Sequence, residues 1–567
     1  MSTLTIHPGT IHENLSQQFT RFTADAVVER LWKKDHTIWR TEEVHRKSIL
    51  NRLGWLDSLD LMQQNIGMLT QFGEEVRAAG FRHVVVLGMG GSSLCPDVCR
   101  ATFGSAPGFP SLSVLDSTNP TSVLRIENAL DLSKTLFIVA SKSGGTTETN
   151  MFYQYFFDRV SSVSKEPGMH FVAVTDAETK MESIAKEKKF RKIFVNPTDI
   201  GGRYSALSYF GLVPMALIGM DIRALLASAE EMRRQSKFDA VQNPAAQLGL
   251  LMGEAHNEGM DKMTLIASPE VSTFAYWVEQ LVAESTGKEG KGVLPVEGEA
   301  WPERYDASVH GEDRFFVFLL LERDAAKADP LRKELAAASV PHAVIMLKDP
   351  YDLGSQFFLW EFGTAVCAVA LHINPFDEPN VKESKDNTVQ VIDEFRKSGA
   401  LPANRVVCSE GNVRITAEAE YAATLPAGGL APLLHAHLTG KAGEDYIALL
   451  AYIDQSAENE RMLYTLRGEL TRRYRLPVTV GFGPRYLHST GQLHKGGPSS
   501  GIFLIITARE PHDVRIPGEP FSFGVLKQAQ ALGDYRSFAH RKLRLLHADI
   551  DGSAADGIAA LTNASLR

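Results

Sequence analysis

Continuous apolar runs alternate with helical segments along the first half of this chain. This alternation restricts the folds that the chain can adopt. The apolar runs lie at residues 83–87, 111–116, 136–140 and 170–175. Because they are unbroken rather than alternately apolar and polar, they indicate strands buried on both faces, as in a parallel sheet covered by helices. Polar loops follow the strands, and open α/β sheets bind ligands at the carboxyl ends of their strands. The sequence therefore predicts an α/β fold with a ligand site in these loops.

The segments before and after this region complete the expected domain organisation. Apolar residues at three-residue steps from Leu53 to Met62 favour helices over residues 10–80. Further candidate strands lie at 262–267, 314–321, 343–347, 446–453, 478–482 and 501–507, with a helix expected over 274–285. We interpret the proline- and glycine-rich patch at 425–432 as a linker. The expected domains are a helical segment over 1–75, a first α/β domain over 76–240 and a second over 241–567.

Composition and charge exclude several classes of partner. The 567 residues are 44% hydrophobic and 22% charged, an ordinary globular composition, with a formal net charge of −9 at pH 7. The charge is spread along the chain without a basic run, which argues against nucleic acid or an anionic membrane as the main partner. An anionic substrate would therefore need a local positive site.

The cysteines and the N-terminus indicate a cytoplasmic protein. Cys95 and Cys99 have no histidine cluster beside them, and their spacing suits neither a zinc site nor a disulfide. We interpret all four cysteines, including Cys367 and Cys408, as buried thiols in a reducing compartment. The first residues lack the basic and apolar regions of a signal peptide, and we find no apolar run long enough to span a bilayer.

A loop rich in hydroxyls and glycines, Ser141 to Thr149, joins the strand at 136–140 to a helix expected over 150–157. Glycine lets the backbone approach an anion closely, and the N-terminus of a helix favours negative charge. The hydroxyls add donors that hold a phosphate without a metal, although the spacing is not that of a Walker loop. On the residues alone, the loop is either a phosphate site or a polar turn that caps the helix.

Five dispersed motifs resemble those of the glucose-6-phosphate isomerase family and occur in the family's order. They are Gly88–Ser92 (GMGGS), Ser141–Thr149 (SKSGGTTET), Gly201–Ser205 (GGRYS), Gln280–Lys288 (QLVAESTGK) and Ile373–Lys385 (INPFDEPNVKESK). The resemblance implies two sugar-isomerase α/β domains, each with a mostly parallel sheet flanked by helices. The motifs are especially similar to those of the isomerase part of bacterial transaldolase–isomerase fusions.

One segment departs from the family's order. In typical members the segment with the ring-opening histidine lies between the glutamate and lysine motifs, whereas the similar segment here, Leu493–Gly497, follows Lys385. We infer that a C-terminal block, about residues 435–540, has moved along the chain and re-enters the second sheet. The resemblance then assigns ring opening to His494, with His488 and His310 as alternatives.

The resemblance implies roles for four residues in an aldose–ketose isomerisation. Moving a proton between adjacent carbons through an enediol(ate) needs a base, a cation near the developing oxyanion and an acid/base that opens the sugar ring. Glu284 is the implied base, Arg203 the cation, His494 the ring-opening group and Lys385 an assistant at the ring oxygen. Without the resemblance, Glu284 would be a helix-end partner of Lys288, and the other three would be structural or solvated residues.

The substrate contacts follow from the same motifs. Ser141, Ser143, Thr146 and the backbone of Lys142 are the implied phosphate ligands. The implied residues of the sugar site are Gly91, Ser92, Gly202 and Gln280. Neither electrons nor a phosphoryl group leaves the substrate, so no metal, nucleotide or other cofactor is expected.

These expectations together describe a cytoplasmic enzyme of glycolysis and gluconeogenesis that interconverts glucose 6-phosphate and fructose 6-phosphate. Two alternatives stay open: a sugar-phosphate sensor that binds without turnover, and an isomerase that also acts on mannose 6-phosphate. Family members complete each site with a histidine of the partner subunit, so the resemblance implies a homodimer. Because the histidine segment is displaced here, one chain could also complete the site by itself.

Overall fold

The computed structural model describes residues 2–299 and 305–567, which form two compact units. Unit 1 comprises Met1–Asp116, Ala129–Tyr305 and Arg314–Asp377. Unit 2 comprises Ser117–Asn128, Asp306–Asp313 and Glu378–Arg567. Unit 2 therefore combines the C-terminal part of the chain with two short segments from earlier in the sequence.

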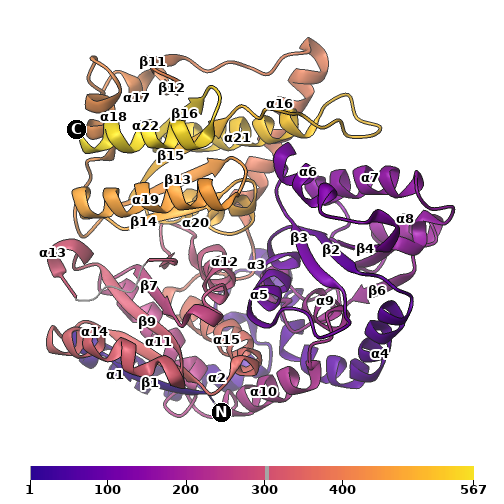
Figure 1. Ribbon diagram of the computed structural model, residues 1–567. Helices are drawn as coiled ribbons and strands as arrows, with labels where there is room; N and C mark the ends of the chain where they lie inside the picture. Colours follow the sequence, from indigo (N-terminus) through magenta and orange to yellow (C-terminus); the bar gives the residue numbers. More distant parts are fainter. Residues whose placement is uncertain (1, 300–304) are drawn as a thin grey trace. The chain divides into compact units, whose positions relative to one another are not determined.

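The first sheet of unit 1 is parallel throughout, with the strand order β3-β2-β4-β5-β6 (Figure 1). Its strands are β2 (His83–Gly88), β3 (Ser111–Leu115), β4 (Thr135–Ala140), β5 (Phe171–Asp176) and β6 (Lys192–Asn196). Successive side chains point to opposite faces. Val84 and Val86 join the large core of unit 1, whereas Phe137 faces the other way and stacks on Phe156, with ring centroids 4.8 Å apart. The sheet is thus buried on both faces, as its unbroken apolar runs predict.

The second sheet of unit 1 has the order β1-β10-β9-β7-β8, with β1 antiparallel and the other strands parallel. Its strands are β1 (Thr3–His7), β7 (Lys262–Ala267), β8 (Leu294–Val296), β9 (Arg314–Leu321) and β10 (His342–Leu347). The helices of unit 1 are α1 (His12–Ala24), α2 (Val27–Trp32), α3 (Glu43–Leu50), α4 (Ser58–Ala78), α5 (Leu94–Phe103), α7 (Thr147–Ser161), α8 (Lys180–Glu187), α9 (Tyr209–Leu217), α10 (Ile222–Gln235), α11 (Pro244–Asn257), α12 (Phe274–Thr286), α14 (Ala325–Ala337) and α15 (Leu353–Leu371).

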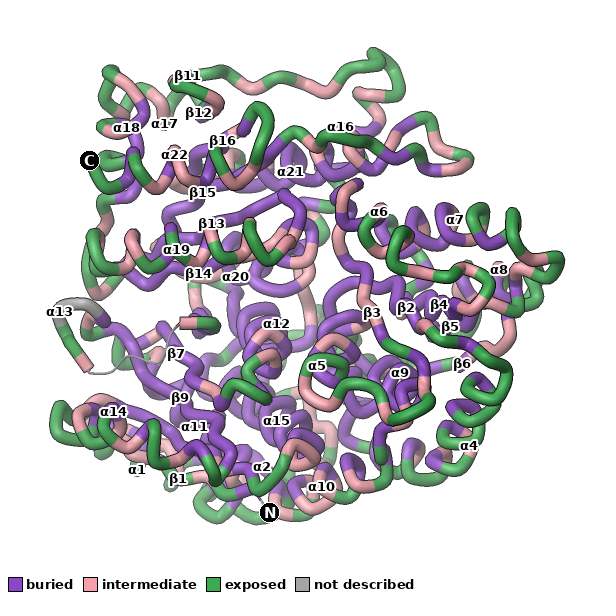
Figure 2. Tube along the Cα trace, in the orientation of Figure 1, coloured by how far each residue is buried: buried purple, intermediate pink, exposed green. Residues whose placement is uncertain are grey.

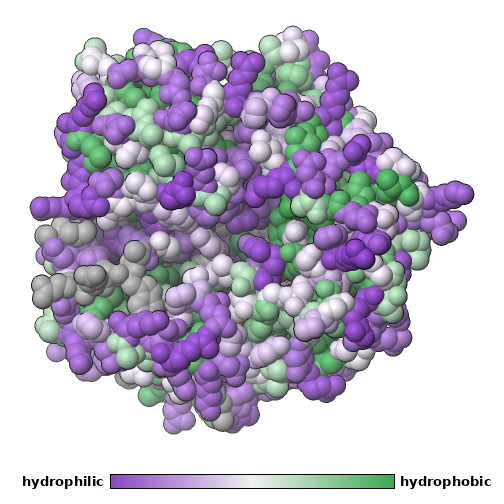
Figure 3. Space-filling model, in the orientation of Figure 1, coloured by the Kyte–Doolittle hydropathy of each residue, from purple (hydrophilic) through white to green (hydrophobic). Residues whose placement is uncertain are grey.

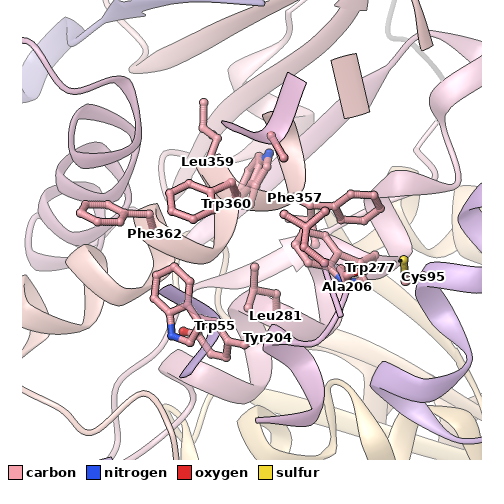
Figure 4. Packing of buried hydrophobic residues seen from close by; sticks show 14 of the residues in the cluster. Trp55, Cys95, Tyr204, Ala206, Trp277, Leu281, Phe357, Leu359, Trp360 and Phe362 are labelled. Carbon is pink, nitrogen blue, oxygen red and sulfur yellow. Dashed lines mark hydrogen bonds between the residues drawn. The ribbon is translucent and has the colours of Figure 1, made fainter. Parts of the chain in front are cut away.

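Helix α15 is the centre of the unit 1 core, and all of its residues are buried (Figure 2). It packs against α10, α11 and α12. Figure 4 shows Phe357 of α15 beside Trp277 of α12, and the two rings meet edge to face with centroids 4.8 Å apart. Among the described residues, Pro350–Leu371 is the one helical stretch long and apolar enough to cross a membrane, and its complete burial identifies it as a core helix.

Unit 2 contains a third sheet with the order β11-β12-β16-β15-β13-β14. Its strands are β11 (Val406–Glu410), β12 (Val413–Thr416), β13 (Tyr446–Tyr452), β14 (Val478–Phe482), β15 (Gly501–Ala508) and β16 (Arg544–Ile550). Strands β13 to β16 are parallel, and β11 and β12 extend the sheet antiparallel. The helices of unit 2 are α6 (Pro120–Asn128), α13 (Ala307–His310), α16 (Pro379–Ser398), α17 (Ala419–Ala422), α18 (Leu430–Leu438), α19 (Ala457–Tyr474), α20 (Gly491–Gly496), α21 (Phe523–His540) and α22 (Ala554–Leu566).

The three sheets share one topology. In each, the first parallel strand in sequence lies between the second and the third, and the fourth follows the third. The sheets differ in the strand beside the fourth parallel strand. In the first sheet it is the parallel strand β6, in the second the antiparallel strand β1 and in the third the antiparallel strand β12. In such sheets the crevice between the first and third strands is the usual ligand site.

In the third sheet, the segment Ser117–Asn128 contacts the residues that follow the first and third parallel strands, β13 and β15. Ser122 donates a hydrogen bond to Asp454 (2.6 Å), which follows β13, and Thr121 donates one to Glu510 (2.7 Å), which follows β15. Thr118 also donates one to Gln530 of α21 (2.6 Å). These contacts explain why the segment belongs to unit 2.

The α/β class and the strands named from the sequence are confirmed, but three details differ. Residues 446–508 form the third sheet with β16 instead of re-entering the second sheet. The N-terminal segment is not wholly helical, because β1 pairs with β10. The patch at 425–432 lies inside unit 2 and leads directly into α18, so it does not link two domains. Cys95, Cys99 and Cys367 are buried, as expected, whereas Cys408 is half-buried.

Candidate active site

Two of the five motifs meet at a glycine contact in unit 1. The turn η4 (Gly90–Ser92) follows β2, and the turn η7 (Gly202–Tyr204) follows β6 in the chain. A Cβ atom on Gly91 would lie 1.9 Å from the carbonyl oxygen of Gly202, so only glycine fits at position 91. The contact places Gly91 and Gly202, the two glycines predicted to line the sugar site, side by side.

Arg203 is buried at the end of this contact, and every nitrogen of its guanidinium has a polar neighbour. Its Nε donates to Ser285 Oγ at 2.9 Å. Its Nη2 donates to the carbonyl oxygens of Pro375 (2.6 Å) and Asp377 (2.9 Å). Its Nη1 lies 3.3 Å from Glu284 Oε1. The neutral acceptors orient the guanidinium, and its remaining edge faces the carboxylate.

Glu284 lies on α12 with 8% of its surface exposed. Its Oε1 faces Arg203, and its Oε2 accepts a hydrogen bond from Gln280 Nε2 at 3.2 Å. Gln280 is one helical turn earlier, so both side chains project from the same face of α12. The sequence-predicted base, cation and glutamine therefore come together in one buried cluster.

A turn at Asn374–Asp377 supports this cluster, and sequence reasoning did not assign it a role. Lys288 is buried; its Nζ donates to the carbonyl oxygen of Asn374 (2.6 Å) and lies 2.8 Å from the Asp377 carboxylate. Asn374 closes the turn by accepting a hydrogen bond from the backbone of Phe376 (3.0 Å). The motifs quoted from the sequence include these residues, but local sequence does not reveal that carbonyls of one motif orient the arginine of another.

Aromatic packing fixes the backbone next to Arg203. Tyr204 packs on Trp55 and on Phe376, with ring centroids 5.3 Å apart in both pairs (Figure 4 labels Trp55 and Tyr204). Burial raises the pKa of the Tyr204 phenol, so this group stays neutral. The arginine is therefore anchored on both sides by rigid neighbours.

The loop Ser141–Thr149 lies at the carboxyl end of β4 and leads into α7. Gly144 has a φ of +64°, and a Cβ atom there would lie 2.9 Å from the backbone nitrogen of Met181, so the loop requires glycine. Ser141 Oγ donates to Thr146 Oγ1 at 3.1 Å, which brings two predicted phosphate ligands together. Thr146 does not cap α7 through its side chain, and the first turn of a helix has N–H groups available for an anion.

Within this loop, two hydrogen-bond acceptors hold the side chain of Lys142. Its Nζ donates to Asp176 and to the carbonyl oxygen of Thr198 (2.8 Å). Burial raises the pKa of the Asp176 carboxyl, and the Lys142 ammonium opposes that shift. The Lys142 side chain thus secures the loop, and the role of the Lys142 backbone as a phosphate ligand stays a prediction. Ser143 is exposed, and its Oγ accepts from the backbone of Gly145 at 3.2 Å.

The other predicted catalytic residues belong to unit 2. Lys385 is exposed on α16. His494 is buried on α20, where its Nδ1 lies 2.9 Å from the hydroxyl of Tyr446 and its ring stacks on that of Tyr446. Burial and the nearby Lys495 lower the pKa of His494 to about 3, so the imidazole is neutral near pH 7.

The two alternative histidines also lie in unit 2. His488 ends the turn η11 (Arg485–His488), which follows β14, and is half-buried. His310 ends α13, and its Nδ1 lies 2.9 Å from the carbonyl oxygen of Asp306. The assignment of ring opening to His494 stays a prediction, and the greater exposure of His488 favours that alternative. Within the described part of the chain, no group of three or more His, Cys, Asp or Glu side chains could hold a metal ion.

Comparison with known proteins supports the family resemblance that the motifs carry. Residues 58–294 match the sequence model of the phosphoglucose isomerase family. A glucose-6-phosphate isomerase of Nostoc punctiforme is 28% identical over 433 residues, 65% of this chain and 82% of that protein. Another, of Cyanothece, is 36% identical over 221 residues, 38% of this chain and 41% of that protein. The resemblance to the phosphoglucose isomerase family is confirmed.

The match to the phosphoglucose isomerase model includes the glycine turns, the loop Ser141–Thr149, Arg203 and Glu284, whereas Lys385 and His494 lie beyond it. Solved structures support the fold. A hypothetical protein of Thermus thermophilus aligns with a TM-score of 0.56 at 23% identity, covering 70% of this chain and all of that one. A glucose-6-phosphate isomerase from Chlamydia trachomatis aligns with a TM-score of 0.53 at 20% identity, covering 65% of this chain and 78% of that one.

Proposed function

We propose that this protein is a glucose-6-phosphate isomerase, which interconverts glucose 6-phosphate and fructose 6-phosphate through a cis-enediol(ate) without a cofactor. The buried cluster of Glu284, Arg203 and Gln280 carries the proposal, because it combines a base with a fixed cation inside the segment that matches phosphoglucose isomerase. A protein that only binds sugar phosphate has no need of a buried base beside a guanidinium.

In the proposed reaction, Glu284 removes the C2 proton of the open-chain aldose and returns it to C1. The negative charge that develops on the oxygens of the enediolate is stabilised by Arg203, which stays protonated. Gln280 orients the carboxylate, and the loop Ser141–Thr149 with Ser92 holds the phosphate and sugar. Ring opening is the role of Lys385 and of a histidine in the segment Arg485–Gly496, which includes His488 and His494.

Exchange of the C2 proton with solvent tests the proposal. In deuterated water, the protein should incorporate deuterium at C2 of glucose 6-phosphate, followed by NMR, alongside turnover in a dehydrogenase-coupled assay. Glu284→Gln should lower both rates on the order of 10² to 10⁴. The control, Glu187→Gln, changes an exposed carboxylate at the end of α8 and should leave both rates intact.

Other results would redirect the assignment. Binding of fructose 6-phosphate by the wild-type protein without turnover would favour the sensor. Turnover of mannose 6-phosphate at a comparable rate would broaden the substrate range. Full activity in Glu284→Gln would remove the base from its role.

We also infer a cytoplasmic homodimer from the family resemblance. On the face shown in Figure 3, hydrophilic side chains are interspersed with small apolar areas, as is usual for a protein in water. Light scattering gives the oligomeric state. Mixing His494→Ala with Glu284→Gln protein would restore activity if two subunits share a site, and would not if one chain completes it.

A further inference from the structure

A fully buried ion pair joins two helices of unit 2. Lys495 Nζ on α20 lies 2.6 Å from Asp534 Oδ1 on α21, and neither side chain has any exposed surface. The ammonium also lies over the ring of Phe538, 5.1 Å from its centroid. Removing two charges from water is costly, and apolar residues of similar size often pack at least as well. Stability alone therefore does not explain why this ion pair is present.

Asp534 connects more than these two helices. Its Oδ2 accepts a hydrogen bond from the hydroxyl of Tyr486 on η11 (2.5 Å). Its Oδ1 accepts one from Ser384 Oγ on α16 (3.0 Å). Four separate elements thus meet at one carboxylate, and each contact is directional.

Two further contacts reinforce the junction between α16 and its neighbours. Asn387 Nδ2, one turn after Ser384, donates to Ser537 Oγ on α21 at 2.9 Å. The backbone nitrogen of Asn380 donates to Gln492 Oε1 on α20 at 2.9 Å. Helix α16 is therefore fixed to both α20 and α21 by polar contacts as well as by packing.

The elements that meet at Asp534 are those that carry the groups proposed for ring opening. Lys385 follows Ser384, His488 lies two residues after Tyr486, and His494 precedes Lys495. We propose that Asp534, through Lys495, Tyr486 and Ser384, is a positioning residue that holds Lys385 and this histidine segment in the register needed to open the sugar ring. The inference rests on the proposed isomerase function and adds a determinant that lies outside the matched family segment.

The reaction offers a readout for ring opening alone. The α and β anomers of glucose 6-phosphate interconvert only through the open chain, so catalysed anomer exchange, measured by NMR exchange spectroscopy, reports ring opening without proton transfer at C2. Glu284→Gln should keep anomer exchange and lose isomerisation. Asp534→Asn should lower anomer exchange and kcat on the order of ten- to hundred-fold, because small misplacements of catalytic groups have effects of that size.

Binding separates positioning from general damage. 6-Phosphogluconate is acyclic and needs no ring opening, so its Kd, measured by calorimetry, should stay within about two-fold of the wild-type value in Asp534→Asn, and KM should change little. The surface variant Asp393→Asn on α16 is the matched control and should behave as wild type. Ser384→Ala removes the hydrogen bonds of Ser384 Oγ to Asp534 and Ser537 without leaving a buried charge unpaired, and should lower anomer exchange by a smaller factor.

The outcomes decide between the alternatives. If Asp534→Asn does not fold, two other proteins provide the test: Ser384→Ala, and the double variant Asp534→Asn with Lys495→Met, which has no buried charge at this position. Anomer exchange at the wild-type rate in both of these variants would overturn the inference. Loss of 6-phosphogluconate binding in proportion to the loss of anomer exchange would also overturn it, because that pattern indicates general damage. Failure of the proposed function looks different, because the wild-type protein itself would then catalyse neither anomer exchange nor isomerisation.

Discussion

Replacing Arg203 by methionine is the sharpest test of the buried cluster in unit 1. The side chain is 5% exposed and has contacts with Ser285, with two carbonyl oxygens and with Glu284. Methionine fills much of the same volume but removes the charge. The variant therefore leaves the Glu284 carboxylate buried without its cation and leaves the carbonyls of Pro375 and Asp377 without this donor.

Two separate effects are expected from this change. Removing one partner of a buried ion pair costs about 3–5 kcal/mol in the free energy of unfolding, because the remaining charge is uncompensated. Removing a donor that stabilises an oxyanion lowers kcat on the order of 10² to 10³, or about 3–4 kcal/mol of transition-state stabilisation. Arg203→Lys restores the charge but cannot reach all four acceptors, so its kcat should lie between those of Arg203→Met and the wild type.

The measurements are steady-state kinetics and urea unfolding followed by tryptophan fluorescence, since Trp55 packs on Tyr204 beside the substituted residue. Arg233→Met is the control, because Arg233 pairs with Asp60 at 2.8 Å on other helices of unit 1. A kcat for Arg203→Met within about three-fold of the wild-type value would refute the reasoning, since one lost oxyanion donor normally has a far larger effect. A loss of the same size in Arg233→Met would show that general destabilisation explains the result.

Three other predictions follow from the structure. Gly91→Ala should abolish isomerase activity and lower the midpoint of thermal unfolding, because the new Cβ would lie 1.9 Å from the Gly202 carbonyl oxygen. The control is Gly104→Ala, which strains the backbone but places its Cβ in open space and should change activity little. Burial lowers the pKa of His437 and of His494 to about 3 and that of His547 to about 4. These three histidines therefore stay neutral in the folded protein at pH 5, whereas in the unfolded chain they bind protons below about pH 6.5. Stability should therefore fall as the pH falls from 7 to 5, by about 2 kcal/mol per histidine, and a calorimetric midpoint that is constant over this range would contradict it. His488→Ala should lower the anomer exchange of glucose 6-phosphate, whereas His494→Phe should mainly lower stability; the opposite pattern would restore His494 as the ring-opening group.

Several of the strands that the sequence predicted are apolar runs buried along most of their length, whereas β16 and β1 were missed because they are not such runs. Residues 83–87 and 136–140 are unbroken apolar runs because both faces of their sheet are covered. β16 includes His547 and Asp549, which pair with Thr507 through hydrogen bonds of 2.8 and 3.0 Å and so tolerate a place in the sheet. A single sequence shows those polar residues but not the partner that satisfies them. Strand β1 was missed for a related reason, since it is a short edge strand with two exposed and three half-buried residues.

The candidate active-site residues of unit 1 could be named from the sequence only because their motifs resemble a family. Spacing alone places Gln280 and Glu284 on one face of α12, and that much is local. The contact of Glu284 with Arg203 joins residues 81 positions apart in sequence, and the contacts of Arg203 with Pro375 and Asp377 join residues even farther apart. Such contacts depend on how two sheets pack within unit 1, which no local pattern encodes.

The family resemblance does not determine which histidine of the segment Arg485–Gly496 opens the sugar ring. A motif fixes which residues follow one another, but the chemistry of a histidine depends on what surrounds it. His494 lies against Tyr446 of β13 and Phe503 of β15, and burial there lowers its pKa to about 3, so the imidazole is neutral near pH 7. His488 is six residues earlier, at the end of a turn that follows β14, and keeps access to solvent. Lys495, the neighbour of His494 on α20, forms the buried pair with Asp534 that joins this helix to α21. The two histidines therefore differ in burial, and this difference is the reason for testing His488 beside His494 as the ring-opening group.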